Sequence, residues 1–531
     1  MDMLAHIGSF FRASFPDMNW QTFPVSFAWY VVSATVGWSA DWPQYRGPNS
    51  DGSTSETLRT DWNVRPPTVL WKKALSPGWS AISVANGRAV TQAKRVVSGT
   101  AREVVVAFDA ATGSELWTTA VDQAKYTQSL SGAAPDSLDG PRSTPSVIGD
   151  RIYVITSFLK VVCLNASTGA VLWMHDLVAE SGAPIIPWSN GASPLVVGDL
   201  LFLNSGIPTR TLTALRITDG TTAWSGQTDP NTHATPCFAT ISGVPQIVFL
   251  TMRGLVGVIP ETGLPLWRYS FAPSTTSTAS TPVVAGDLVY ASCAYGKGAG
   301  TARVSKNGDA FAVTQPKFQQ ATEYQNHWAT PVVHEDALYS IVERGADRSL
   351  TCYDLGGRTN RWRVETVGST RPGYASLIKA GGILVVLTEE GELVLVKPGA
   401  NYEELGRYPA LNSFCWNQPT LSGGRLFARS SGEIVALDVA PTVTPPPPVL
   451  LTAEINPART SIRVLIRAAN GDSLEALGHR LQLQTTDNSG VSWKPLAGTL
   501  SAHTGMLEAA VLLDGEGQLL RVQALDGPPS P

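Results

Sequence analysis

The stretch FDAATGSELW (residues 108–117) decides the fold, because its pattern recurs along the chain. Clear copies read LNASTGAVLW (164–173), LRITDGTTAW (215–224) and PETGLPLW (260–267). Weaker copies read VSKNGDAF (304–311), YDLGGRTNRW (353–362) and VKPGANYEELG (396–406). Successive copies lie 43 to 56 residues apart, at or just above the range of propeller blades. The repeat therefore predicts one supersecondary unit per copy.

The two ends of the repeat array complement each other. The eighth copy stops at IVALDVA (434–440) with no tryptophan strand behind it, while TVLWKKAL (68–75) is a tryptophan strand with no repeat body in front of it. We therefore expect a closed ring in which residues 68–75 complete the last blade, with Trp71 as the structural closure. Eight closing strands then serve eight bodies, and their shared column holds Trp71, Trp117, Trp173, Trp224, Trp267, Phe311, Trp362 and Gly406.

Each repeat reads as four short strands. The first strand is entered through a Thr-Pro or Ser-Pro step, as in STPSVIGD (143–150) and ATPVVHED (329–336), and proline is tolerated at the start of a strand. Gly-Asp, Asn-Gly or Gly-Gly pairs then supply the positive φ that short hairpins need. Runs rich in β-branched and aromatic residues follow, without an amphipathic helix. The sequence predicts an all-β protein with an eight-bladed β-propeller.

Composition agrees with this fold class and excludes some functions. The 531 residues include 48 Gly, 37 Pro and 16 Trp, with 15% charged residues. The formal net charge of −4 gives no basic field for nucleic acid. The five cysteines contain no adjacent pair and no C-x-x-C motif, so we expect buried apolar thiols and no zinc or haem attachment.

Four segments are expected along the chain. Residues 1–40 form a signal peptide with an apolar run at 23–38; the start lies at Met1 or Met18, and an N-terminal membrane anchor is the alternative. Residues 41–440 form the propeller, and PTVTPPPP (441–448) is a stiff linker. Residues 449–531 alternate like strands and predict a small β-sandwich-like domain.

The repeat phrase resembles a known family. The pattern D/N-x-x-T-G-x-x-x-W at 109–117 and 165–173 is similar to the repeat of quinoprotein dehydrogenases, which bind pyrroloquinoline quinone (PQQ). It equally resembles the non-enzymatic PQQ-like propellers, including the outer-membrane protein assembly factor BamB. The opening DWPQYRGPNSDG (41–52) looks like the start of secreted PQQ-like propellers from planctomycete and verrucomicrobial bacteria. The resemblance covers residues 41–440 and carries more weight for fold than for activity.

The resemblance to quinoprotein dehydrogenases implies a specific axial site. Its parts are a calcium held by Glu and Asn, an Asp base and a vicinal disulfide over the quinone; calcium needs oxygen ligands, and the base takes the alcohol proton. This chain has no adjacent cysteines. The nearest acids to the starts of first strands are Asp139 and Glu323, and neither lies in a ligand motif. PQQ with calcium is therefore not firmly predicted.

The residues that lead into the first strands form the candidate site. In a propeller these starts converge on one mouth of the central channel. His233 and His327 are either a pH-sensitive or metal-binding pair or partners of loop backbone, whereas Arg142, Trp79 and Trp416 suit a carboxylate or a sugar. The predicted ligand- or partner-binding residues at the mouth are Trp79, Arg142, Asn190, His233, His327, Tyr374, Trp416 and Asn417.

Three functions follow from this sequence. The resemblance to BamB implies an exported, non-catalytic scaffold, monomeric and in the periplasm, at the cell surface or outside the cell, that binds a protein or peptide partner in the cell envelope. The first alternative is a PQQ- and calcium-dependent alcohol or sugar dehydrogenase. The second is a carbohydrate-binding propeller, which the aromatic mouth favours.

Overall fold

The protein is described from a computed structural model that divides into two compact units, Trp38–Thr442 and a second unit made of Met1–Gly37 with Val443–Pro531. The structure describes residues 41–441, except 127–133, 272–277, 315–317, 320–323 and 356–358, together with strands at 26–28 and between 449 and 524. Residues 442–448 of the predicted linker (441–448) and most of the predicted signal peptide (1–40) lie outside the described residues.

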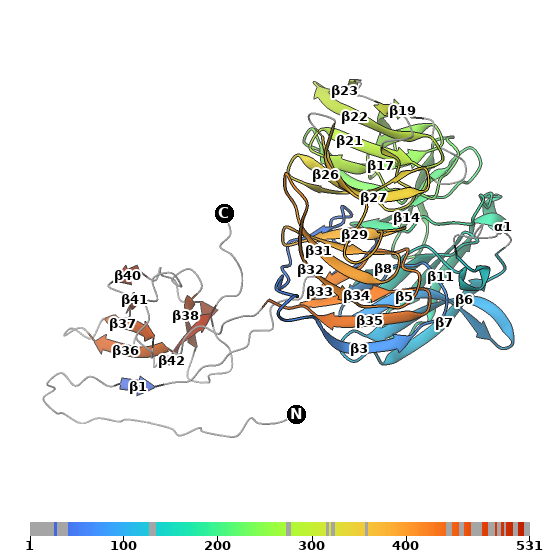
Figure 1. Ribbon diagram of the computed structural model, residues 1–531. Coiled ribbons are helices and arrows are strands. Elements are labelled where there is room, and N and C mark those ends of the chain that lie inside the picture. The colour runs from blue at the N-terminus through green and yellow to red at the C-terminus, as the bar shows by residue number, and fades with distance from the viewer. Residues whose placement is uncertain are drawn as a thin grey trace, which may run out of the picture. The chain divides into compact units, whose positions relative to one another are not determined.

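The first unit is an eight-bladed β-propeller, as the repeat predicts. Its sheets follow one another in chain order, so that the colour changes from blue to orange around the ring (Figure 1). The four main strands of each blade pair antiparallel, in order from an inner to an outer strand. Blade 1 consists of β4 (Ser83–Ala85), β5 (Arg88–Val97), β6 (Thr100–Asp109) and β7 (Glu115–Gln123), and blade 2 of β8 (Ser146–Ile148), β9 (Arg151–Ile155), β10 (Lys160–Asn165) and β11 (Val171–Asp176). Blade 3 consists of β12 (Leu195–Val197), β13 (Leu200–Asn204), β14 (Leu212–Arg216) and β15 (Thr222–Gly226), and blade 4 of β16 (Cys237–Ile241), β17 (Val244–Thr251), β18 (Gly254–Val258) and β19 (Pro265–Ser270).

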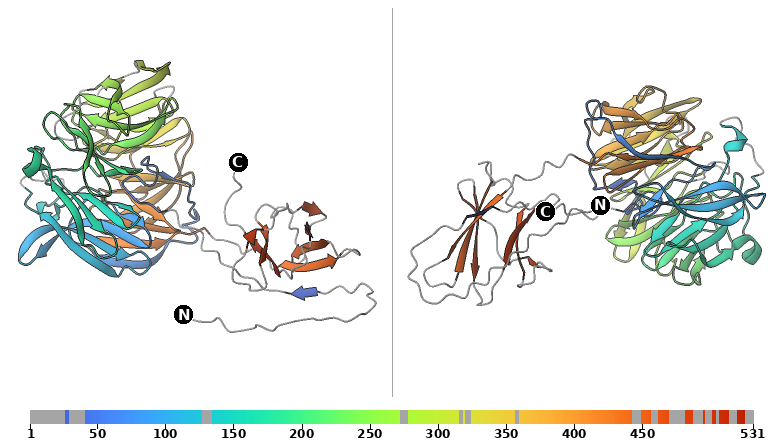
Figure 2. Two further views of the ribbon diagram at one scale, coloured as in Figure 1. Left: turned by 180° about the vertical axis from the view of Figure 1, so that it is seen from behind. Right: turned by 90° about the horizontal axis from the view of Figure 1, so that it is seen from below.

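The other four blades complete the ring, which Figure 2 shows from two further sides. Two of them contain strands from elsewhere in the chain, β2 (Ser53–Thr54) and β3 (Thr68–Ala74). Blade 5 consists of β20 (Val283–Ala285), β21 (Leu288–Cys293), β22 (Gly298–Asn307) and β23 (Ala310–Thr314), with β24 (Phe318–Gln319) beside β22, and blade 6 of β25 (Val332–His334), β26 (Ala337–Arg344), β27 (Asp347–Asp354) and β28 (Thr359–Val364). Blade 7 consists of β29 (Ser376–Ala380), β30 (Ile383–Leu387), β31 (Glu392–Lys397) and β32 (Glu403–Pro409), with β2 beside β29. Blade 8 consists of β33 (Thr420–Ser422), β34 (Arg425–Arg429) and β35 (Glu433–Asp438), with β3 as its outer strand.

Four column tryptophans, Trp71, Trp117, Trp173 and Trp224, pack on the turn glycine of the next blade. A Cβ atom built on Gly113 would lie 2.5 Å from the Trp71 ring, and one on Gly169 would lie 2.5 Å from the Trp117 ring. These glycines have φ of +69° and +71°, a region that favours glycine. The Trp117 Nε1 donates to the Ala166 carbonyl at 3.0 Å. The repeat phrase is therefore a contact between blades, and all eight column positions lie on outer strands.

The N-terminal strand closes the ring, as predicted. Strand β3 pairs antiparallel with β35, with Trp71 opposite Ala436, and the two lie side by side in Figure 1. Trp71 is buried, its Nε1 donates to the Ala110 carbonyl at 3.1 Å, and its ring packs against Phe108 and Phe427. The last blade thus takes its outer strand from the beginning of the propeller.

A segment ahead of β3 crosses the channel along the inner strands; we call residues 42–54 the channel strap. Trp42 exchanges backbone hydrogen bonds with Val84 in blade 1, the Gln44 side chain accepts from Val196 N in blade 3, and β2 pairs with β29 in blade 7. Inner edge strands present unpaired N–H groups. The channel strap, which contains most of the motif DWPQYRGPNSDG (41–52), provides hydrogen-bond partners for several of these groups.

Helical structure is slight in the described part of the chain, where the bounded elements are α1 (Leu177–Ser181) and the 3-10 turn η1 (Asp136–Leu138). No helix among the described residues is long and apolar enough to span a membrane. Cys163, Cys237, Cys293, Cys352 and Cys415 are free and buried, as the sequence predicts.

The described strands of the second unit form two sheets. One is five-stranded, in the order β1 (Ser26–Ala28), β36 (Val449–Ile455), β37 (Ser461–Ala468), β41 (Met506–Leu512), β40 (Ser501–His503). The other is three-stranded, in the order β39 (Lys494–Pro495), β38 (Leu481–Thr486), β42 (Leu519–Ala524). The strands agree with the alternating pattern of residues 449–531, and β1 falls within the segment that the sequence assigns to a signal peptide.

Candidate functional site

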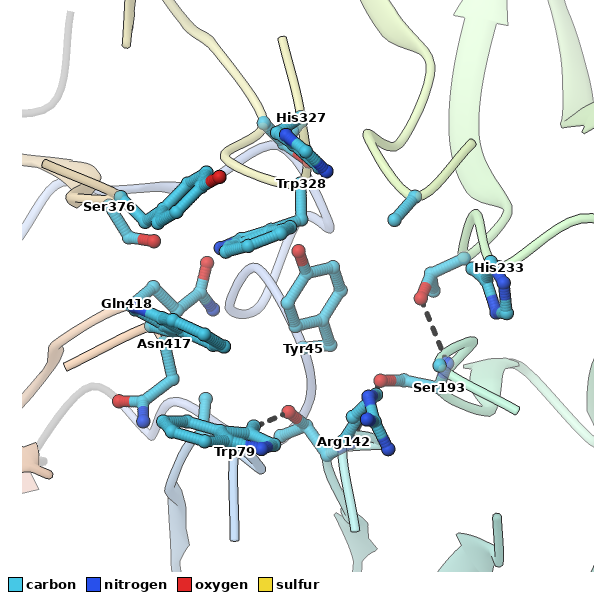
Figure 3. A pocket seen from close by; sticks show the side chains of 18 of the residues that line it. Tyr45, Trp79, Arg142, Ser193, His233, His327, Trp328, Ser376, Asn417 and Gln418 are labelled. Atoms are coloured by element: carbon cyan, nitrogen blue, oxygen red, sulfur yellow. Dashed lines mark hydrogen bonds between the residues drawn. The ribbon is translucent and has the colours of Figure 1, made fainter. Parts of the chain in front are cut away.

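One end of the channel holds a pocket of about 310 Å³ to which all eight blades contribute side chains. Figure 3 shows these side chains arranged around Tyr45 of the channel strap. The step residues that enter the first strands also line the pocket, except Thr281 of blade 5. Four of their backbone N–H groups donate to the side-chain hydroxyl of the step residue in the next blade. These bonds run from Ala81 N to Thr144, Thr144 N to Ser193, Ser193 N to Thr235 and Thr281 N to Thr330, at 2.9 to 3.1 Å.

A simple register rule selects the side chains that line the pocket. The residue two positions before each step residue lines it in every blade, because residues i and i+2 of an extended chain share a side. Four of the eight are large aromatic residues, two are polar and two are small. In blade order they are Trp79, Arg142, Gly191, His233, Ala279, Trp328, Tyr374 and Trp416.

Seven of the eight predicted residues line this pocket; Asn190 does not. Asn190 lies three positions before Ser193, is buried, and its side chain bonds the backbone of Thr156 and Ala192. Gly191 takes the lining position of blade 3 instead. The prediction that Asn190 lines the mouth is therefore wrong. It rested on closeness in sequence to the step residue, whereas the strand register selects the residue two positions before the step and Asn190 lies three positions before it.

Sequence reasoning missed four aromatic lining residues. Trp328 directly follows His327 and occupies the lining position of blade 6, so the register rule would have found it. Tyr45 comes from the channel strap, which the repeat does not place. Trp188 and Tyr295 belong to loops outside the register.

The aromatic rings of blades 1, 6, 7 and 8 form one continuous wall. Trp79 stacks on Trp416 with ring centroids 4.3 Å apart, and Trp328 stacks on Tyr374 at 4.3 Å. Trp328 and Trp416 join the two pairs at 5.1 Å. Stacked and tilted pairs at these separations are favourable beyond their burial, so the wall is preorganised.

Carboxylates lie behind this wall rather than in the pocket. Asp139 accepts from Trp79 Nε1 at 3.2 Å and pairs with Arg142 at 2.8 Å. Glu389 accepts from Trp416 Nε1 at 2.6 Å. Each carboxylate therefore fixes the orientation of a lining ring through one of its oxygens.

The two histidines occupy separate environments. His327 Nδ1 lies 2.8 Å from Glu343 Oε2. Burial, with a smaller effect of the Arg142 charge, lowers the pKa of His233 to about 4, against the raising effect of the Pro187 and Ser189 carbonyls. His233 is therefore neutral at neutral pH, and no group of three or more His, Cys, Asp or Glu among the described residues is placed to hold a metal ion.

The pocket does not fit the quinoprotein chemistry that the resemblance implies. Its described lining contains no Asp, Glu or Cys, whereas calcium takes six to eight oxygen ligands that include carboxylates. Asp139 is engaged by Trp79 and Arg142, and Glu323 lies outside the described residues. The described donor set at the mouth therefore does not match a calcium–quinone site.

Comparison with known proteins agrees with the fold. A family model described as outer membrane protein assembly factor BamB matches residues 63–130 and 127–345, more than half of the chain, so the protein belongs to this family of PQQ-like propellers. A curated relative, the outer membrane protein assembly factor BamB of Moranella endobia (strain PCIT), is 29% identical over 226 residues. That match covers 39% of this chain and 52% of the relative, so the chain matches about half of the relative's length.

Solved propellers are similar in structure at low sequence identity. BamB from Moraxella catarrhalis has a TM-score of 0.47 and 16% identity, covering 70% of this chain and 99% of its own. The quinohemoprotein alcohol dehydrogenase from Comamonas testosteroni has a TM-score of 0.49 and 14% identity, covering 79% of this chain and 84% of its own.

Proposed function

We propose that this protein is an exported, non-catalytic scaffold of the cell envelope that binds a protein partner on the outer strands of its propeller. The observation that carries the proposal is a set of exposed apolar side chains on three successive blades, 8, 1 and 2. Their side chains are 43–49% exposed. The set consists of Val69 and Leu70 on β3, Leu116 on β7, and Val171, Leu172 and Met174 on β11.

The repeat itself explains the orientation of the three leucines in this set. Leu70, Leu116 and Leu172 each precede a column tryptophan, and successive side chains of a strand point to opposite faces. When the tryptophan packs on the next blade, the leucine before it faces away. Each outer strand also has one unpaired edge, which can accept an added strand of a partner.

Three further observations support the proposal. The relative from Moranella endobia is named an outer membrane protein assembly factor, which suggests a protein partner in the envelope. The apolar run at residues 23–38 is typical of an export signal. The described lining of the mouth contains no carboxylate of the kind that dehydrogenase chemistry needs, which favours binding over catalysis.

Site-specific crosslinking in cells tests the proposal. A photoreactive amino acid at Leu172 should capture a discrete envelope protein, whereas the same group at Leu264, 60% exposed beside β19 of blade 4, should not. The captured protein, once purified, should bind the wild-type chain and bind L116E/L172E at least tenfold more weakly. Equal capture from both positions, or full binding by L116E/L172E, would show that the partner docks elsewhere.

A further inference from the structure

The pocket at the channel mouth has the shape of a blind site for a small molecule. The channel strap lies across the channel and places Tyr45 in the pocket lining. Its volume of about 310 Å³ falls at the lower end of the range for small-molecule sites. Such a pocket accepts a single ring or the end of a chain, because a continuous polymer cannot thread past the strap.

The lining residues divide the pocket into a filled side and an open side. Blades 1, 6, 7 and 8 present the aromatic wall, whereas blades 3 and 5 present Gly191 and Ala279. Gly191 and Ala279 are the two smallest of the eight lining residues, so they leave the pocket open on the side away from the stacked rings. A flat, C–H-rich surface is the complement of such a wall.

The charges around the pocket are matched by partners in its wall. Arg142 pairs with Asp139 at 2.8 Å, and Glu343 contacts His327 at 2.8 Å and Arg348 at 3.8 Å. A charged ligand would have to compete with these pairs and pay for its own desolvation. The pairing favours a ligand without net charge.

Several buried polar atoms of the lining have no partner among the described residues. They include both amide atoms of Asn417, Nε2 of Gln418 and Nε1 of Trp328, and Asn417 and Gln418 are at least 94% buried. A buried donor or acceptor without a hydrogen bond is costly and uncommon in native proteins. The ligand that satisfies them must offer both donors and acceptors, as hydroxyl groups do.

We propose that this pocket binds a neutral saccharide, with a pyranose face on the Trp416–Trp328 wall and its hydroxyl groups on Asn417 and Gln418. A pyranose combines an apolar C–H face with a rim of hydroxyls and carries no charge. The proposal is independent of the outer-strand scaffold, because the two sites use different residues of the blades.

A binding screen with the full-length protein tests this assignment. The probes are glucose, galactose, mannose and N-acetylglucosamine with their dimers to tetramers, sialylated and sulfated glycans, and proline-rich peptides. Binding is confirmed by calorimetry and by a change in tryptophan fluorescence. We expect a neutral saccharide to bind and the charged glycans and peptides not to bind.

Matched variants separate the site from the fold. Asn417→Leu and Ala279→Phe should each weaken the saccharide at least about tenfold, the first by removing hydrogen bonds and the second by filling the space. Trp362→Phe, on an outer strand and outside the pocket lining, should leave the saccharide affinity unchanged. Asn417→Leu should melt no lower than wild type, so its loss of binding would not reflect unfolding.

Four outcomes would overturn the proposal. They are binding of acidic glycans alone with loss in Arg142→Gln, binding of proline-rich peptides alone, unchanged saccharide affinity in both Asn417→Leu and Ala279→Phe, and absence of saccharide binding at millimolar concentration.

Discussion

Trp71→Ala tests whether a strand from the N-terminus holds the ring closed. Trp71 is 6% exposed and lies between Phe108 of blade 1 and Phe427 of blade 8. Truncation therefore leaves a cavity at the one seam where the two neighbouring blades are not consecutive in the chain. We expect destabilisation of the whole ring, because each blade packs only on its neighbours.

The structure sets the size of the effect. Truncation of a buried large side chain costs about 3–5 kcal/mol, and loss of the donor to the Ala110 carbonyl (3.1 Å) adds about 1 kcal/mol. For a unit of about 400 residues the entropy of unfolding is about 0.8 kcal/mol/K. A loss of about 5 kcal/mol therefore lowers Tm by about 6 °C.

Calorimetric melting of the purified protein measures this shift. The matched control is Trp117→Ala, which removes the equivalent indole from a seam between consecutive blades, where Trp117 is only half-buried; we expect a smaller drop. Deletion of residues 68–75 should lower Tm further than Trp71→Ala. A Trp71→Ala protein that melts within 1 °C of wild type, or an unchanged Tm after the deletion, would refute closure by β3.

Other parts of the propeller give three further predictions. Gly169→Ala should cost about 3 kcal/mol in urea unfolding, since its Cβ would lie 2.5 Å from the Trp117 ring, whereas Gly149→Ala, with nothing within 4 Å, should cost about 1 kcal/mol for its positive φ; equal costs would contradict the packing role. Burial raises the pKa of Glu103 to about 7 from 4.5, against hydrogen bonds from Ser157 and Tyr126. Glu103 therefore stays protonated to a higher pH in the folded state than in the unfolded state. The free energy of unfolding falls by about 3 kcal/mol as the pH rises from about 4.5 to 7, and Glu103→Gln should flatten that part of the pH profile. Arg429→Met should destabilise the ring by about 3 kcal/mol or more, because it leaves the buried blade 1 acceptors of Gln92 and Gly78 unpaired; an unchanged urea midpoint would argue against a role at the seam.

The fold was predictable because its repeat encodes a contact between neighbours. The turn glycine and the tryptophan of the same phrase serve two different interfaces. Gly113 receives Trp71 from the preceding blade, and Trp117 is received by Gly169 of the next blade. A periodic pattern with this meaning determines the number of blades and the need for closure, even where the copies weaken to Phe311 and Gly406.

The lining of the pocket was predictable only in part, because it depends on strand register and on a segment outside the repeat. The hydrogen bonds between step residues hold Thr144, Ser193 and Thr235 at one level around the axis. Position minus two then faces the pocket in every blade, which is why Trp328 lines it and Asn190 does not.

Register alone does not place the floor of the pocket. Tyr45 reaches it because the channel strap pairs with inner strands of blades that lie far away in sequence, as when Arg46 donates to the carbonyl of Pro331 at 2.6 Å. No period in the sequence signals such a crossing, since the strap occurs once and matches no repeat. The shape of the site is therefore set jointly by a periodic rule, which can be read from the step residues, and by a single aperiodic segment, which requires the three-dimensional structure.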